Sequence, residues 1–199
     1  MSSILLFCTA QEAKSLASKI SKHVETTEGY DDALAIVKSR GEVSADEKFE
    51  TQPDANGSLE TQWVGASVEE VRDWVLQNQE KLRDNEIADA NLIAILDYRS
   101  AKDETIRMDY YRDRPGLPFR ESGLHPEEGG PPYTEVEILP PKSDVWYSFR
   151  IRYQHFHQLV ADLTGVTSAE VVFPYYFGRK DEFLDDQGIF DLDKVFDAL

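Results

Sequence analysis

The clearest pattern of apolar and polar positions lies between residues 144 and 165. Residues 145–153 alternate, which predicts a β-strand with one buried face. The apolar side of this alternation consists of Val145, Tyr147, Phe149, Ile151 and Tyr153. After residue 153 the apolar spacing changes to three and four residues, as on one face of a helix, and Gly165 stands where that helix is expected to stop. The stretch therefore predicts a strand that leads directly into a helix.

Several other segments have strand patterns. Residues 4–8 are apolar without a break, as are residues 92–96 of the segment 91–96, which is typical of strands that are buried on both faces of a sheet. Residues 105–111 alternate and follow a polar turn, so we expect them to form a hairpin with residues 91–96. Two shorter strands are predicted at 135–139 and at 170–177, the second at a sheet edge because its proline has no N–H to donate.

Helix signals accompany these strands. A serine or threonine followed three residues later by a glutamate predicts a capping box at the start of a helix. Two such pairs occur, Thr9 with Glu12 and Ser67 with Glu70. Residues 31–39 carry apolar side chains at a spacing that predicts a further helix, and a closing helix is expected to begin near Asp191.

Together these elements predict an α+β, or mixed α/β, domain. A central mixed sheet of about five or six strands would be packed by four or five helices. The length of 199 residues suits a single globular domain spanning 1–199. Residues 42–62 are polar and are expected to form either a hairpin or a surface loop, and residues 112–133 form a long proline-rich loop of a kind that is often functional.

The net charge of −17, from 38 acidic against 21 basic residues, changes the expected partners. Such a surface repels a nucleic-acid backbone, so we predict no direct nucleic-acid binding. A basic protein partner is compatible with it. The single cysteine excludes a disulfide framework, the N-terminus does not resemble a signal peptide, and no apolar run is long enough to cross a bilayer. We therefore expect a soluble cytoplasmic protein without membrane association.

One stretch departs from the acidic composition. Residues 99–120 hold more basic than acidic side chains, and two further arginines lie on the polar side of the strand at 145–153. If the two strands are neighbours, these side chains share a surface that could bind an anion or an acidic group, because a guanidinium forms paired hydrogen bonds with carboxylates and phosphates. The candidate residues are Arg107, Tyr111, Arg150, Arg152 and His155. The alternative is that the arginines pair with local acids such as Asp97 and Asp109.

Other candidate chemistry is weaker. His155 and His157 point in different directions if the segment is helical, which disfavours a metal site, and no metal or other cofactor is predicted. Cys8 lies at the end of a strand where a helix begins, a position that favours a thiolate, but no base can be assigned to it and a buried inert thiol is expected. The acidic residues near the C-terminus lack the spacing of a calcium loop and are expected to form a solvated face.

Two functional hypotheses follow. The first is a non-catalytic protein-binding module, of which an inhibitory or immunity-type protein that neutralises a basic partner is one version. The second is a small-molecule enzyme or ligand carrier, with an anion-binding pocket lined by the arginines and covered by residues 113–133. A deep pocket that gathers several of the candidate side chains would favour the second hypothesis, and a convex acidic face would favour the first.

Overall fold

A computed structural model of the chain describes residues 3–28, 34–44, 46–54, 59–84, 88–112, 144–164 and 174–198. The predicted proline-rich loop 112–133 lies outside these residues except for its first position. The predicted strand at 135–139 lies wholly outside them. That residues 1–199 form a single domain remains a prediction.

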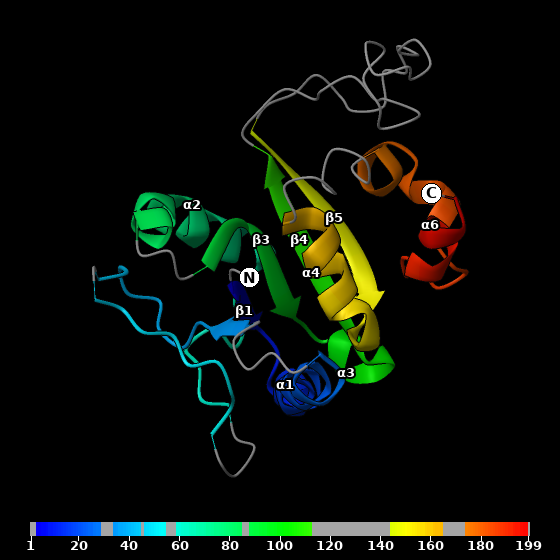
Figure 1. Ribbon diagram of the computed structural model, residues 1–199. Helices are drawn as coiled ribbons and strands as arrows, with labels where there is room; N and C mark the ends of the chain where they lie inside the picture. The colour runs from blue at the N-terminus through cyan, green and yellow to red at the C-terminus, as the bar shows by residue number, and fades with distance from the viewer. Residues whose placement is uncertain are drawn as a thin grey trace.

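The centre of the described structure is a five-stranded mixed sheet with the strand order β2-β1-β3-β4-β5 (Figure 1). Its strands are β1 (Ser3–Cys8), β2 (Leu34–Ile36), β3 (Ala88–Leu96), β4 (Thr105–Arg112) and β5 (Val145–Arg152). β2 and β3 both pair with β1 in parallel, whereas β4 is antiparallel to β3 and β5 is antiparallel to β4. This sheet and its surrounding helices confirm the predicted α+β fold class.

The first face of the sheet is covered by two helices and by the C-terminal segment (Figure 1). These elements are α1 (Lys14–Glu28), α4 (Phe156–Thr164), the π-helical turn η4 (Pro174–Gly178), the 3-10 turn η5 (Lys180–Phe183) and α6 (Leu192–Ala198). Alternate strand residues such as Leu6, Ala94 and Ile151 are buried beneath them. The predicted strand at 145–153 therefore places its apolar side on this face, as the alternation indicates.

The second face carries a smaller apolar core under α2 (Val68–Asp84). The capping box predicted at the start of this helix is present, because the Glu70 N–H bonds to the Ser67 hydroxyl and the Ser67 N–H bonds to the Glu70 carboxylate. Trp74 of α2 packs edge-on against Phe7 of β1 and against Trp63, with ring centroids 5.7 Å apart in both pairs. This core fixes α2 over the β1–β3 half of the sheet.

The C-terminal segment also protects the outer edge of the sheet. The Phe190 N–H donates to the Arg150 carbonyl at 2.7 Å, and the Lys180 ammonium donates to the Ser148 carbonyl at 3.3 Å. Both carbonyls point outward from the edge strand β5. Their partners lower the tendency of this part of the edge to pair with another chain.

Three local predictions are wrong. Residues 34–36 form β2 instead of part of a helix, because pairing with β1 buries all three side chains. The Thr9 hydroxyl bonds to the Leu96 carbonyl at 3.3 Å instead of capping a helix, and the following 3-10 turn η1 (Gln11–Ala13) begins after Ala10. The described part of the predicted strand 170–177 belongs to η4, where the aromatic side chains pack inward.

The described part of residues 42–62 does not form the expected hairpin, and the alternative of a surface loop remains a prediction. The Ile36 N–H donates to the Glu50 carbonyl at 2.8 Å, which makes a single antiparallel bridge at the end of β2. Within the described residues, no strand pairing joins 48–52 to 59–64. The described residues of 37–54 are therefore an irregular segment, tied to the sheet by this bridge and by the Val37 N–H, which donates to the Leu6 carbonyl of β1 at 3.0 Å.

Candidate functional site

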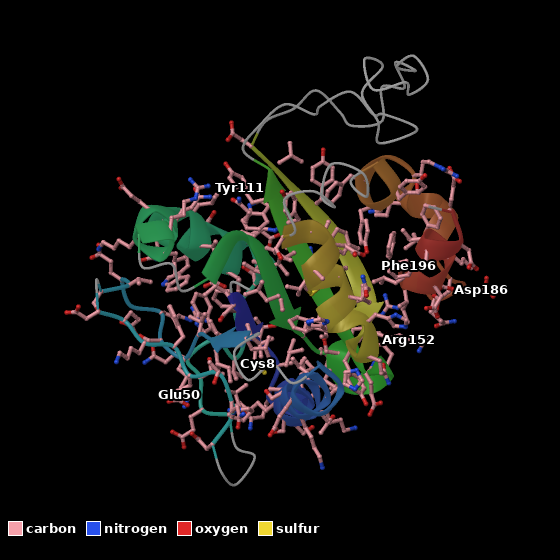
Figure 2. All side chains as sticks on the ribbon, in the orientation of Figure 1. Cys8, Glu50, Tyr111, Arg152, Asp186 and Phe196 are labelled. Carbon is pink, nitrogen blue, oxygen red and sulfur yellow. The ribbon has the colours of Figure 1, made fainter. Side chains whose placement is uncertain are left out.

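The candidate residues from the sequence lie mainly on the second face of β4 and β5. The register places Arg107 directly opposite Arg150, and it places Tyr111 opposite Trp146 and Thr105 opposite Arg152. Residues that face each other in this register lie on the same side of the sheet. The structure therefore brings four of the five predicted residues onto one face, spread along the length of the strand pair from Tyr111 to Arg152 (Figure 2).

The centre of this face is Asp109, whose side chain is completely buried, at 0% exposure. From α2, Arg72 reaches across and places its Nε 2.8 Å and its Nη2 2.7 Å from Asp109 Oδ2. Arg107, two residues along the same strand, donates its Nε–H to Asp109 Oδ1 at 2.9 Å. One buried carboxylate thus accepts charge-assisted hydrogen bonds from two guanidinium groups.

Ser148 joins the two arginines on the neighbouring strand. Its hydroxyl oxygen accepts a hydrogen bond from Arg72 Nη2 at 2.7 Å and another from Arg107 Nη2 at 3.1 Å. The Nη1 groups of both arginines make no hydrogen bond within the described part of the chain. The Arg72 and Arg107 side chains are 20% and 28% exposed, so the pair is only partly withdrawn from water. We call Arg72, Arg107, Asp109 and Ser148 the arginine cluster.

The arginine cluster has an excess of positive charge. Two guanidinium groups share one carboxylate, which leaves one positive charge without a matching negative charge among the four residues. Partial burial lowers the effective dielectric constant and strengthens the attraction of such a charge for an anion.

Arg150 belongs to a separate, balanced pair. Its guanidinium bonds to the Asp97 carboxylate and also donates to the hydroxyls of Thr105, at 2.9 Å, and Ser100, at 3.3 Å. Burial alone would raise the pKa of Asp97, but the hydrogen bond and charge of Arg150 and the bonds from Ser100 outweigh it and hold the pKa below its usual value. The alternative that the sequence offered is thus present at both acids, since Arg150 pairs with Asp97 and Arg107 pairs with Asp109. Arg150 is therefore less available to a ligand.

Arg152 and His155 lie beyond the arginine cluster. Arg152 is more than half exposed and sits 3.4 Å from Asp185 in the C-terminal segment. His155 follows in the 3-10 turn η3 (Tyr153–His155) and, among the described residues, makes no hydrogen bond with the guanidinium groups. The structure therefore separates these two residues from the centre of the face.

An aromatic pair adjoins the arginine cluster on its other side. Trp146 and Tyr111 lie side by side with ring centroids 5.1 Å apart, and the Arg72 guanidinium carbon lies 5.4 Å from the centre of the Trp146 ring. Tyr111 is nearly buried and its hydroxyl donates to Asp144 at 2.8 Å. The tyrosine hydroxyl is thus used within the fold, whereas the half-buried indole of Trp146 gives the arginine cluster an apolar border.

Arg72 was not predicted from the sequence as a site residue, and Asp109 was predicted only as an acid that pairs with an arginine. The apolar spacing of α2 predicts which side of the helix is buried, and Arg72 lies at the border of that side. The pattern contains no information on which strand the arginine reaches, because the two contacts join residues 37 and 76 positions apart.

The structure also describes the cysteine and the side chains that were considered as metal ligands. Cys8 is buried and its thiol lies 3.2 Å from the Ala10 carbonyl, and burial raises the pKa of this thiol to about 11. It is therefore protonated at neutral pH and poorly suited to nucleophilic attack. Among the described residues, no three histidine, cysteine or acidic side chains are grouped closely enough to hold a metal ion.

Comparisons with known proteins provide no relative for this chain. No protein-family model, no curated protein and no solved structure matches it.

Within the described residues, no helix has the length and apolar composition that a membrane crossing requires.

Proposed function

We propose that this chain is a binding protein that recognises an anionic group, a carboxylate or a phosphate, at the arginine cluster. The observation that carries the proposal is the shared ion pair, in which Arg72 and Arg107 both bond to the buried Asp109 and leave one positive charge in excess. In a chain of net charge −17 this excess is a local exception. The proposal develops the second functional hypothesis without assigning a reaction.

The geometry favours short-range recognition. Asp109 and Ser148 hold one edge of each guanidinium, so the groups are ordered before a ligand arrives and lose little conformational freedom on binding. The Nη1 groups remain as donors, and the indole of Trp146 offers an apolar surface beside them. The net negative charge opposes long-range attraction of anions, so affinity must come from these direct contacts.

Thermal unfolding with a panel of phosphates and carboxylic acids tests the proposal. A ligand at ten times its dissociation constant should raise the midpoint by about 3–6 °C in a domain of this size. Arg107→Gln removes the excess charge and is expected to abolish the shift. Arg179→Gln is the matched control, because Arg179 forms an exposed ion pair with Glu182 three residues along the chain. An unchanged shift in Arg107→Gln, or no shift with any anion, would contradict the proposal.

A second candidate function, binding of a basic protein partner, is favoured by the C-terminal segment. Phe196 is 46% exposed on α6, near the exposed Asp193 and Asp197, and Figure 2 shows Phe196 and Asp186 on this side of the molecule. Binding of a lysine-rich peptide, followed by fluorescence anisotropy, should weaken in Asp193→Asn with Asp197→Asn. Equal binding by this double variant and by Glu12→Gln with Glu25→Gln, a control on η1 and α1 that also removes two negative charges, would show that charge alone, and not this face, attracts the peptide. The cytoplasmic location also remains a prediction.

A further inference from the structure

A cavity of about 190 Å³ lies beyond the carboxyl end of β2. The bridge between Ile36 and Glu50 lies at the end of the strand, and both residues line the cavity together with Trp74 of α2. Glu50 is labelled in Figure 2 on this side of the sheet, away from β4 and β5. None of the four residues of the arginine cluster lines this cavity.

The cavity has an apolar wall and a charged border. The half-buried Phe49 provides apolar surface, and Val37, Val43 and Trp74, which also line the cavity, are more than nine-tenths buried. The Trp74 Nε1–H donates to the Gly41 carbonyl at 2.8 Å, so the indole is held in one orientation and its N–H is satisfied. The volume is below the roughly 300–1,000 Å³ of pockets for drug-sized ligands, so the cavity suits a small molecule or a single side chain.

Some charged side chains at the border of the cavity have a partner of opposite charge and others do not. Lys38 bonds to Glu50 and lies 3.3 Å from Asp54, and Glu42 is paired with Lys81. Glu47 accepts a hydrogen bond from the Ser44 hydroxyl at 3.2 Å, and no cation among the described residues pairs with it. The exposed Lys48 is the remaining positive charge. The lining therefore has three glutamates against two lysines.

We infer that this cavity binds a small organic cation, an ammonium group carried on an apolar body. The ammonium lies at the Glu47 carboxylate, and the apolar body packs against Trp74 and Phe49, whose rings also attract a positive charge. An ammonium group occurs on free amines and on the lysine side chains of proteins, and the chemistry of recognition is the same for both.

The test compares n-butylammonium with n-butanol, which has the same apolar body without the charge. Thermal unfolding of the full chain at constant ionic strength is expected to shift upward by about 3–6 °C for the amine at ten times its dissociation constant, and by much less for the alcohol. A third probe, Nα-acetyl-lysine amide, distinguishes a free amine from a lysine side chain of a protein. If it binds, the cavity is open to a lysine on a peptide backbone. If only n-butylammonium binds, the cavity is restricted to free amines.

We expect two surface variants to change the thermal shift caused by the amine in opposite directions. Glu47→Gln should abolish the amine shift, whereas Lys48→Gln should strengthen it by removing a competing positive charge. Glu12→Gln, an exposed acid on η1, is the control and should bind as the unaltered chain does. An equal shift with amine and alcohol, a weaker response in Lys48→Gln, or no shift at millimolar amine would overturn the inference. None of these outcomes depends on whether the arginine cluster binds anions.

Discussion

Replacing Asp109 by asparagine tests the arginine cluster most severely. The substitution preserves the shape of the side chain and removes the negative charge that Arg72 and Arg107 share. Two guanidinium groups are then left close together on a partly buried face without their common carboxylate. The same change raises the excess positive charge of the cluster from one to two.

The expected loss of stability follows from burial. Removing one partner of a fully buried ion pair typically costs about 3–5 kcal/mol, because the remaining charge is left uncompensated. Asp109 is fully buried, but the two arginines are 20% and 28% exposed and keep some contact with water. We therefore expect Asp109→Asn to lower the free energy of unfolding by about 2–3 kcal/mol, which corresponds to a fall of about 4–12 °C in the midpoint.

Urea unfolding measures this loss, and an anion titration of the folded variant measures the second consequence. Because the excess charge increases, phosphate should bind Asp109→Asn more tightly than it binds the unaltered chain. Glu182→Gln is the control, since an exposed pair contributes about 1 kcal/mol or less. A loss below about 1 kcal/mol in Asp109→Asn would refute the reasoning on burial. A loss of stability without tighter anion binding would reduce the arginine cluster to a structural role.

Three further predictions concern single elements. Cys8 should resist alkylation at neutral pH until the chain unfolds, because burial raises the pKa of its thiol to about 11; intact-mass analysis measures this, and rapid labelling of the folded chain would contradict it. Ser67→Ala should lower the free energy of unfolding by about 1 kcal/mol in urea, because it removes the side-chain cap that holds the Glu70 N–H, and an unchanged midpoint would contradict this. The pKa of Asp97 is lower in the folded chain than its ordinary value of 3.8, so its pair with Arg150 stabilises the fold above that pH and loses this contribution as the pH falls toward the lowered pKa. Stability measured against pH should accordingly fall less steeply on the acid side in Asp97→Asn, and an identical profile would contradict the assignment.

The sequence predicts the sheet well where the pattern is long and regular. Alternation over residues 145–153 predicts the strand, which ends at Arg152, and the face that each of its side chains occupies. The pairing of 91–96 with 105–111 places Arg107 opposite Ile95 of β3. Once β5 pairs with β4, the polar sides of the two strands coincide. For this reason the candidate arginines share a face, as expected.

The failures occur where a short pattern is compatible with two structures. Residues 34–36 have apolar side chains that fit one turn of a buried helix or a central strand, and only the pairing with β1 decides between them. The aromatic run at 174–177 resembles a strand, yet Tyr176 is buried within a π-helical turn and its hydroxyl bonds to Asp162 at 2.7 Å. Local propensity is a weak guide in such segments because tertiary contacts override it.

The centre of the candidate site could not be predicted for a related reason. Arg72 belongs to a helix, whereas Asp109 and Ser148 belong to two different strands, and their meeting depends on how α2 packs on the sheet. Pairing between strands, by contrast, follows from register and is accessible to sequence patterns. The sequence therefore indicates the strand arginines and omits the helix arginine that gives the cluster its excess charge.

The most direct test of anion binding is an NMR titration that follows the side-chain Nε–H signals of the arginines as phosphate is added. Arg72 and Arg107 donate these N–H groups to Asp109, which should slow their exchange with water and make them observable. The account predicts saturable shifts for these two signals and none for Arg179, which is exposed and paired with Glu182. Shifts that do not saturate, or that are the same at all three arginines, would contradict an anion site at the arginine cluster.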